Sequence, residues 1–184
     1  RRAAIRELGT LGKRGDERAV AELRGRLAQA GSNDYDETKA LVIEALGETG
    51  NRALLDDVAQ YLARGFHMRM RMAAAGAVGA LQEARGMEPL LAVLREAGGP
   101  TSPPDDLLDV VIRSLGRLKA NPEGRASTAL LEFVQGLRGG TNGASTGATG
   151  LLAVVAEALG QFRYPPSAES TCRVTLLLQE LAAH

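Results

Sequence analysis

The chain has 184 residues, of which 45% are hydrophobic and 3% aromatic, and its 22 basic and 22 acidic side chains give a formal net charge of zero. This hydrophobic share excludes a generally disordered chain, and the Leu, Ala and Val that supply it suit packed helices better than a β-sandwich. The balanced charge argues against a dedicated nucleic-acid or membrane-surface binder, whose affinity would come from clustered Lys and Arg.

A short motif that ends in Gly recurs along the chain, beginning with Ile5-Arg6-Glu7-Leu8-Gly9. Apolar residues around each copy are spaced as on one face of a helix, so each copy predicts the first helix of a repeat. The residue before the Leu-Gly or Val-Gly pair is small in most copies, which would let a neighbouring helix approach closely. The other copies are Ile43 to Gly47, Ala75 to Gly79, Ile112 to Gly116 and Ala156 to Gly160, and the small residues are Ala45, Ala77, Ser114 and Ala158.

Each first helix is followed by a turn rich in Gly, Asn or Pro and then by a second apolar-periodic segment. Asp16, Asn51 and Ser167 are placed to cap the second helices, and Thr49 alone breaks the apolar pattern of the first helices. No segment has the alternation of a strand. The predicted hairpins cover residues 1–30, 37–65, 67–97, 105–138 and 151–184, and the longest linker, the Gly-rich stretch 139–150, is expected to be a mobile loop.

These features resemble the HEAT-repeat family, in particular its short bacterial form first described in phycobilisome lyases. The resemblance rests on patterns such as Ala45-Leu46-Gly47-x-x-Gly50 and Ala19-Val20-x-x-Leu23. It implies an all-α fold: an α/α solenoid, wound as a right-handed superhelix, of about five HEAT-like helical hairpins in a single array over residues 1–184. The second glycine of the pattern is present as Gly12 and Gly50, whereas Gln82, Lys119 and Arg163 replace it in the later copies.

The chain offers little for catalysis or for metal binding. His67 and His184 are the only histidines and Cys172 is the only cysteine, so a multi-Cys metal site and an intrachain disulfide are excluded. Cys172 precedes an apolar segment, which favours a packing role over that of a nucleophile. HEAT-type iron hydroxylases carry His-Glu pairs, and HEAT-like DNA glycosylases use aromatic and acidic residues around a basic groove; the chain matches neither. We therefore expect no enzyme activity, no cofactor and no metal.

By elimination, we expect a non-catalytic scaffold or adaptor that binds a protein partner. Two alternatives stay open: a bilin-lyase-like or chaperone-like subunit that acts on a tetrapyrrole-binding protein, and a nucleic-acid-binding module, which the balanced charge disfavours. No apolar run is long enough to predict a membrane span, and the single cysteine fits a reducing cytoplasm. The chain could also associate with a second copy of itself or pack against further repeats.

The resemblance implies that the second helices line the concave face on which partners bind. Their polar positions include Glu22, Glu132 and Gln135. The positions that we expect to contact the partner are Arg18, Asp56, Asp57, Gln60 and Arg95.

The stretch His67-Met68-Arg69-Met70-Arg71-Met72 supports two interpretations. In the first, Arg69 and Arg71 edge an adaptable Met surface that holds an acidic partner. In the second, which the spacing favours, one Met packs inward and both arginines lie in solvent, because residues two apart do not share a helical face.

On the outer face of the first helices, the position two before the motif Leu or Val and the position four residues later are mostly charged or polar, as with Arg113 and Arg117. In the third copy these positions are Gly76 and Ala80. We hypothesise that a partner, a second copy or another part of a longer protein packs on this smooth patch.

Charge is uneven between hairpins, since residues 1–30 carry eight basic and four acidic side chains and residues 31–62 carry two basic and seven acidic ones. This pattern favours attraction between neighbouring hairpins over a bipolar surface that orients a partner. Arg1 and Arg2 oppose the dipole of an N-terminal helix, and Leu176-Leu177-Leu178 with Leu181 would form a wide apolar girdle. We therefore expect a segment of a longer array.

Overall fold

The computed structural model describes residues 2–29, 36–96, 105–119, 121–139, 146–162, 175–176 and 179. Every regular element within these residues is helical, which confirms the all-α fold class. The chain divides into two compact units, an N-terminal unit (Arg1–Pro89) and a C-terminal unit (Leu90–His184). The single array over 1–184 stays a prediction.

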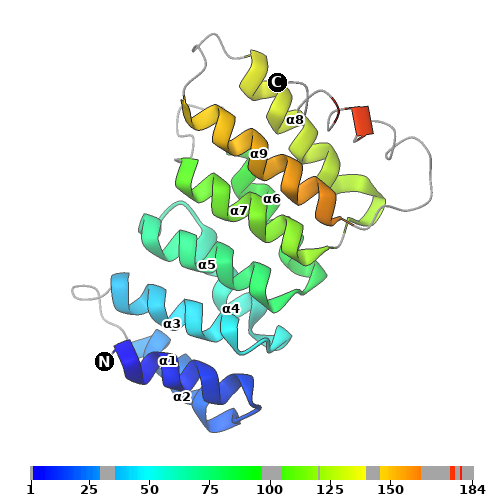
Figure 1. Cartoon of the computed structure of the whole chain (residues 1–184). Coiled ribbons are helices and arrows are strands. Elements are labelled where there is room, and N and C mark those ends of the chain that lie inside the picture. Colours follow the sequence, from blue (N-terminus) through cyan, green and yellow to red (C-terminus); the bar gives the residue numbers. More distant parts are fainter. Residues whose placement is uncertain are drawn as a thin grey trace. The chain divides into compact units, whose positions relative to one another are not determined.

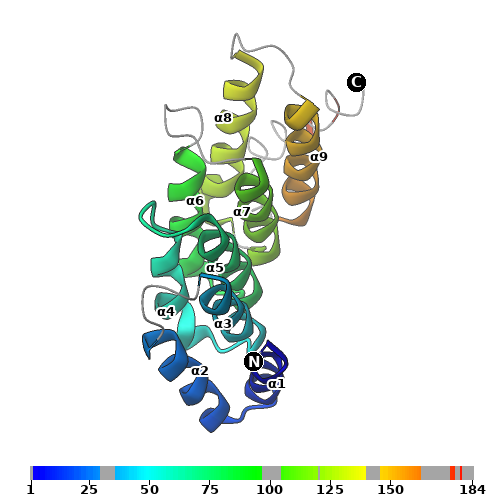
Figure 2. The same cartoon turned by 90° about the vertical axis from the view of Figure 1, so that its left-hand side faces the viewer.

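In the N-terminal unit, the first helices of three hairpins form one layer: α1 (Arg2–Lys13), α3 (Asp36–Glu48) and α5 (Met68–Leu81), with α3 packed against both of the others (Figure 1). The second helices α2 (Glu17–Gln29) and α4 (Leu55–Ala59) form a second layer on one face of the first (Figure 2). The described residues of the unit also contain three 3₁₀ turns, η1 (Arg52–Leu54), η2 (Gln60–Leu62) and η3 (Ala84–Gly86). The predicted stack of helical hairpins is therefore present in this unit.

The boundary between the units falls inside α6 (Met87–Arg95). The C-terminal unit continues with α7 (Asp105–Leu118), η4 (Pro122–Gly124), α8 (Arg125–Gly139) and α9 (Thr146–Gln161), and α7 packs against α9. Because α9 begins at Thr146, the last five residues of the expected loop 139–150 are helical, and that part of the prediction is wrong. Ser167, Cys172, His184 and most of the last predicted helix lie outside the described residues; of its apolar girdle only Leu176 is described, and it is 55% exposed.

Small residues set the distance between stacked first helices. A Cβ atom added at Gly47 would lie 2.6 Å from Cα and 2.7 Å from Cβ of Ala77, so α3 and α5 touch through their backbones. The same pairing joins Gly9 to Ala45, at 3.2 Å, and Gly116 to Ala158, at 3.0 Å. The expectation that the small motif residue permits close approach is confirmed for these three pairs.

The second glycine of the motif marks a left-handed backbone position even where glycine has been replaced. Gly50 has a φ of 69°, and the residues that replace glycine at this position, Gln82 and Lys119, have φ values of 51° and 54°. In the first hairpin α1 continues past Gly12, and Gly15 takes the positive φ instead, at 92°. Gly12 is therefore a packing residue: its added Cβ would lie 2.8 Å from Cγ2 of Thr49.

The capping prediction is confirmed at two of its three positions. Asp16 Oδ1 accepts hydrogen bonds from the backbone N–H groups of Arg18 and Ala19, at 2.9 and 3.2 Å, and Asn51 Oδ1 accepts one from Ala53 at 3.1 Å. Thr49 is buried although it breaks the apolar pattern. Its hydroxyl donates to the carbonyl of Leu46 at 2.7 Å, so its polar atom is satisfied inside the core.

Candidate functional site

Among the described residues, a groove lies between consecutive second helices in each unit. Pairs of buried residues four apart give the register of these helices: Leu23/Leu27 on α2, Val58/Leu62 on α4 and η2, Leu90/Leu94 on α6, and Leu130/Val134 on α8. In this register most of the lining positions of the two grooves coincide. Tyr61 follows Val58 by three residues, as Phe133 follows Leu130, and each ring lines its groove.

The groove of the N-terminal unit, between α2 and the segment α4–η2, has a volume of about 400 Å³. Its lining residues are Arg24, Gly25, Leu27, Ala28, Asp57, Gln60 and Tyr61. Arg24 Nε lies 2.8 Å from Asp57 Oδ2, so an ion pair joins the two walls. That buried oxygen accepts no hydrogen bond, and the longer contact from Arg24 Nη2 to Asp57 Oδ1, at 3.4 Å, supplies the directional part. The pair is therefore chiefly electrostatic.

The Tyr61 ring is held at the edge of this groove by a second ring. The centroids of Tyr61 and Phe66 are 4.8 Å apart with their planes tilted by 55°, within the centroid distances of favourable aromatic pairs. Partial burial raises the pKa of the Tyr61 hydroxyl, and the nearby Asp57 carboxylate raises it further, because both disfavour a phenolate. Both effects favour the neutral phenol.

The groove of the C-terminal unit, between α6 and α8, has a volume of about 450 Å³. Its lining residues are Leu94, Arg95, Ala129, Glu132, Phe133, Gly136 and Leu137. Leu94 is buried, Phe133 and Leu137 are half-buried, and Arg95 and Glu132 are exposed at the rim. A Cβ atom added at Gly136 would meet nothing within 4 Å, so this position opens the groove.

The predicted contact residues of the second helices are distributed unevenly. Asp57 and Gln60 line the groove of the N-terminal unit and Arg95 lines that of the C-terminal unit. Arg18 and Asp56 are exposed but line neither groove, and Asp56 lies 4.0 Å from Arg85. The prediction missed Tyr61 and Phe133; aligning the second helices on their buried Leu and Val pairs would have found them.

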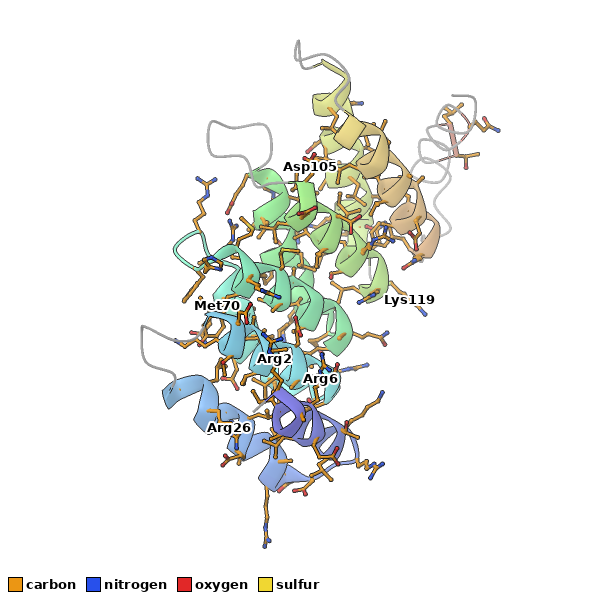
Figure 3. All side chains as sticks on the ribbon, turned by 60° about the vertical axis from the view of Figure 1, so that its left-hand side comes forward. Arg2, Arg6, Arg26, Met70, Asp105 and Lys119 are labelled. Carbon is orange, nitrogen blue, oxygen red and sulfur yellow. The ribbon has the colours of Figure 1, made fainter. Side chains whose placement is uncertain are left out.

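The two arginines of the Met-rich stretch have opposite environments. Arg69 is exposed, and its guanidinium makes a 2.6 Å ion pair with Glu37, which also pairs with Arg2 of α1 at 2.5 Å. Arg71 is 6% exposed and its Nε donates to the carbonyl of Leu62 at 2.8 Å. The expectation that both arginines lie in solvent is therefore wrong for Arg71. Its long side chain turns inward, because its guanidinium donates to the carbonyl of the last residue of η2. The inward Met is Met70, labelled with Arg2 in Figure 3.

Ion pairs between hairpins support the preferred interpretation of the uneven charge. Arg2 and Glu37 join the basic first hairpin to the acidic second one on the first-helix layer, and Arg24 and Asp57 join them on the second-helix layer. Attraction between neighbouring hairpins is confirmed at these two contacts. Such exposed pairs contribute at most about 1 kcal/mol each.

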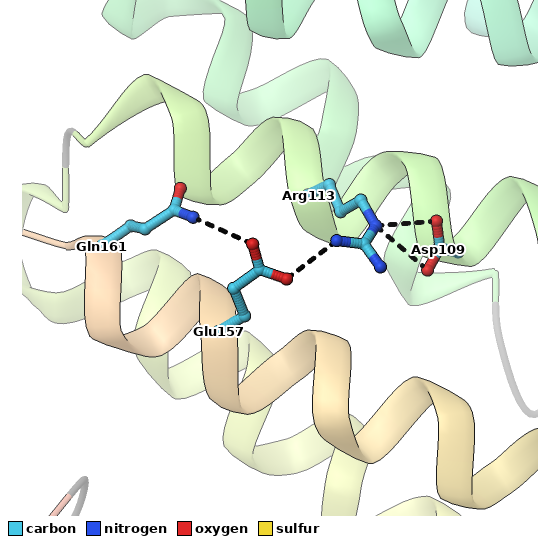
Figure 4. A network of polar contacts seen from close by, with 4 residues as sticks. All are labelled: Asp109, Arg113, Glu157 and Gln161. Carbon is cyan, nitrogen blue, oxygen red and sulfur yellow. Dashed lines mark hydrogen bonds and ion pairs between the residues drawn. The ribbon is translucent and has the colours of Figure 1, made fainter.

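On the outer face, α7 and α9 are linked by a polar network (Figure 4). Arg113 donates to both carboxylate oxygens of Asp109 one turn earlier and to Glu157 on α9 at 2.8 Å, and Gln161 donates to Glu157 at 3.5 Å. The hydrogen bond to Asp109, followed by the charge of that carboxylate and of Glu157, raises the pKa of Arg113. These outer positions thus serve the contact between two helices.

At the smooth patch of α5, Gly76 is half-buried and Ala80 is exposed, and a Cβ atom added at Gly76 would meet nothing within 4 Å. The hypothesis that another surface packs there stays a prediction. On the neighbouring helix α3, the pKa of Glu44 is raised, chiefly by partial desolvation of its carboxyl and then by the charge of Glu48.

Groups suited to metal binding or to membrane insertion do not occur in the part of the chain that the structure describes. No three His, Cys, Asp or Glu side chains among those residues gather in a way that could hold a metal ion. None of the described helices combines the length and apolar character that crossing a membrane requires.

No model of a known protein family and no curated protein matches the sequence. Among solved structures, the complex of CpcE and CpcF of phycocyanin lyase from Nostoc sp. PCC7120 is similar, with a TM-score of 0.47 and 16% identity over 98% of this chain and 88% of the matched chain. Membership of the HEAT family stays a prediction.

Proposed function

We propose that the chain is a non-catalytic protein-interaction module that holds a partner on the face of its second helices. The observation that supports this proposal is the recurrence of one groove. Tyr61 and Phe133 occupy the same position of the repeat, and each lines a groove between consecutive second helices. A half-buried ring in a concave site supplies large contact area at small entropic cost, which is the property of interaction hot spots.

The composition of the grooves favours binding over chemistry. Their polar groups are an arginine–carboxylate ion pair, an amide, a protonated tyrosine hydroxyl and two rim charges, and neither lining contains a His or a Cys. A nucleophile next to a base is absent from both linings, and so is a pair of carboxylates. Such walls can recognise shape and charge, as a scaffold requires.

Filling the grooves tests the proposal without disturbing the core. Gly25 and Gly136 line the two grooves from helical positions, and added Cβ atoms there would meet nothing within 4 Å. The variants Gly25→Gln and Gly136→Gln place a polar side chain in each groove, and Gly76→Gln, at an equally open position on the outer face, is the matched control. All three replace a helical glycine, so each should gain stability by about 0.5–1 kcal/mol.

The measurement is affinity purification of the tagged chain from its native source, followed by reconstitution of each captured protein with purified components. We expect a protein that binds the unaltered chain and the Gly76→Gln control directly but loses affinity for a groove-filled variant. Captured proteins that bind all variants equally would contradict the proposal. Loss of binding in the Gly76→Gln variant alone would instead place the partner on the outer face.

A further inference from the structure

The two grooves differ at the position that decides whether they are open. Asp57 in the N-terminal unit corresponds in the register to Ala129 in the C-terminal unit. The Arg24–Asp57 ion pair spans the first groove at 2.8 Å, so an occupant would have to displace it or pass over it. Ala129 offers no charge for such a bridge, and Arg95 and Glu132 make no ion pair with any described residue. The α6/α8 groove is therefore the accessible one.

The walls of the α6/α8 groove are mostly apolar and therefore favour an apolar occupant. Leu94, Phe133 and Leu137 supply the lining on both helices, and the absence of a side chain at Gly136 leaves the mouth open. Its volume of about 450 Å³ lies in the range of sites that enclose a small organic ligand, so more than one apolar side chain fits. Burying such side chains removes apolar surface from water and so favours binding.

The backbone of the occupant must bring its own hydrogen bonds. The described residues contain no strand whose edge could pair with an extended peptide, and the lining offers only the side chains of Arg95 and Glu132 as polar partners. An extended segment in this groove would leave buried N–H and C=O groups unpaired, which disfavours its binding. A helix satisfies its backbone internally and presents apolar residues three and four apart along one face.

We infer that the α6/α8 groove binds an amphipathic helix of the protein partner, an inference that rests on the proposed function. The apolar face of this helix packs on Leu94, Phe133 and Leu137. Its flank toward α6 carries an acidic residue that pairs with Arg95, and its flank toward α8 carries a basic residue that pairs with Glu132. Both rim charges are exposed, so the pairs set the orientation of the helix more than its affinity.

The test is selection of binding peptides from a random displayed library on the full chain, with each enriched peptide then titrated by calorimetry and circular dichroism. Enriched peptides are expected to repeat apolar residues three and four apart, with acidic and basic residues on opposite flanks, and to gain helicity on binding. Their affinity should fall about ten-fold or more for Gly136→Gln and stay within about two-fold for the outer-face control Gly76→Gln. Glu132→Lys should weaken binding, and replacing the basic peptide residue with Glu should restore it.

The possible outcomes separate the inference from the proposed function. Peptides that lose affinity for Gly25→Gln but not for Gly136→Gln would overturn the inference and leave the proposed function standing. Enriched peptides without helical periodicity, or without a gain of helicity on binding, would overturn it as well. Peptides whose binding ignores both variants would contradict both the inference and the proposed function. Because Gly136→Gln should be at least as stable as the unaltered chain, loss of binding there is not explained by unfolding.

Discussion

The contact between Gly47 and Ala77 makes the most direct prediction about stability. In the interior of an open helix, Gly→Ala gains about 0.5–1 kcal/mol, because alanine loses less backbone entropy on folding. At Gly47 the new methyl group would lie 2.6 Å from Cα and 2.7 Å from Cβ of Ala77. Carbon atoms rest about 3.5–4.0 Å apart, so α3 and α5 would have to separate by roughly 1 Å.

Such overpacking costs about 1–3 kcal/mol, and neither atom of Ala77 can rotate away. Allowing for the gain in helix propensity, Gly47→Ala should lower the free energy of unfolding by about 1–2 kcal/mol, or the midpoint of thermal unfolding by about 3–6 °C. The matched control is Gly76→Ala on α5 of the same unit, where an added Cβ meets nothing within 4 Å. This control should raise stability.

The assay is urea and thermal unfolding followed by far-ultraviolet circular dichroism. Two further variants grade the effect: Gly116→Ala, whose nearest backbone contact is 3.0 Å, and Gly9→Ala, whose nearest contact is 3.2 Å, should cost progressively less than Gly47→Ala. A Gly47→Ala variant as stable as the Gly76→Ala control would refute the close approach of α3 and α5. An order of stabilities unrelated to these distances would refute the reasoning for the series.

Three more predictions follow from single residues. Gln82→Gly and Lys119→Gly should each stabilise the chain by about 0.5–1 kcal/mol, because glycine adopts their positive φ values without steric cost; urea unfolding that shows no gain would contradict this. Arg71→Met should lower the free energy of unfolding by about 1–3 kcal/mol, because it removes the donor to the buried Leu62 carbonyl. Arg69→Met loses only an exposed ion pair and should lower it by less than about 1 kcal/mol. Equal unfolding midpoints for the two variants would be inconsistent with a buried Arg71. The pKa of Tyr61 is raised above 10.0, so the unfolded chain releases this proton first and stability should fall as the pH rises from about 10 toward the folded pKa. Asp57→Asn should lower the pKa of Tyr61 and so narrow the pH range over which stability falls. Titration of the phenolate absorbance would detect the change, and an unchanged or higher pKa would rule out the contribution of Asp57.

Periodicity and turn residues predicted most of the described helices and the pairing of α1 with α2 and of α3 with α4, because burial of one helical face is a local property of the sequence. The small residues Ala45, Ala77 and Ala158 even indicated which backbones touch. The fate of Arg71 was not predictable from spacing alone, since its burial depends on a carbonyl nine residues earlier in the chain. Gln82 and Lys119 looked like losses of the motif, yet the stack imposes the left-handed turn on both residues.

The candidate site was harder to predict than the fold. Asp57, Gln60 and Arg95 were chosen as polar positions of the second helices, and these three line grooves. Tyr61 and Phe133 were overlooked, because a half-buried ring in an apolar-periodic helix looks like core until the helices are aligned. The difference between a bridged and an open groove depends on Arg24 meeting Asp57 across two hairpins, and no local pattern reveals such a contact.

The position of Glu37 between two arginines has a consequence for how the N-terminal unit opens. One carboxylate at the start of α3 receives Arg2 from α1 and Arg69 from α5, so three stacked helices share a single acceptor. Amide protons of α3, which is covered on both sides, should exchange with solvent more slowly than those of α1, which packs against α3 alone among the first helices. High ionic strength screens both ion pairs of Glu37 and should widen this difference in exchange rate between α1 and α3. Helix α1 should then separate from α3 as a local unit while α3 and α5 stay packed together.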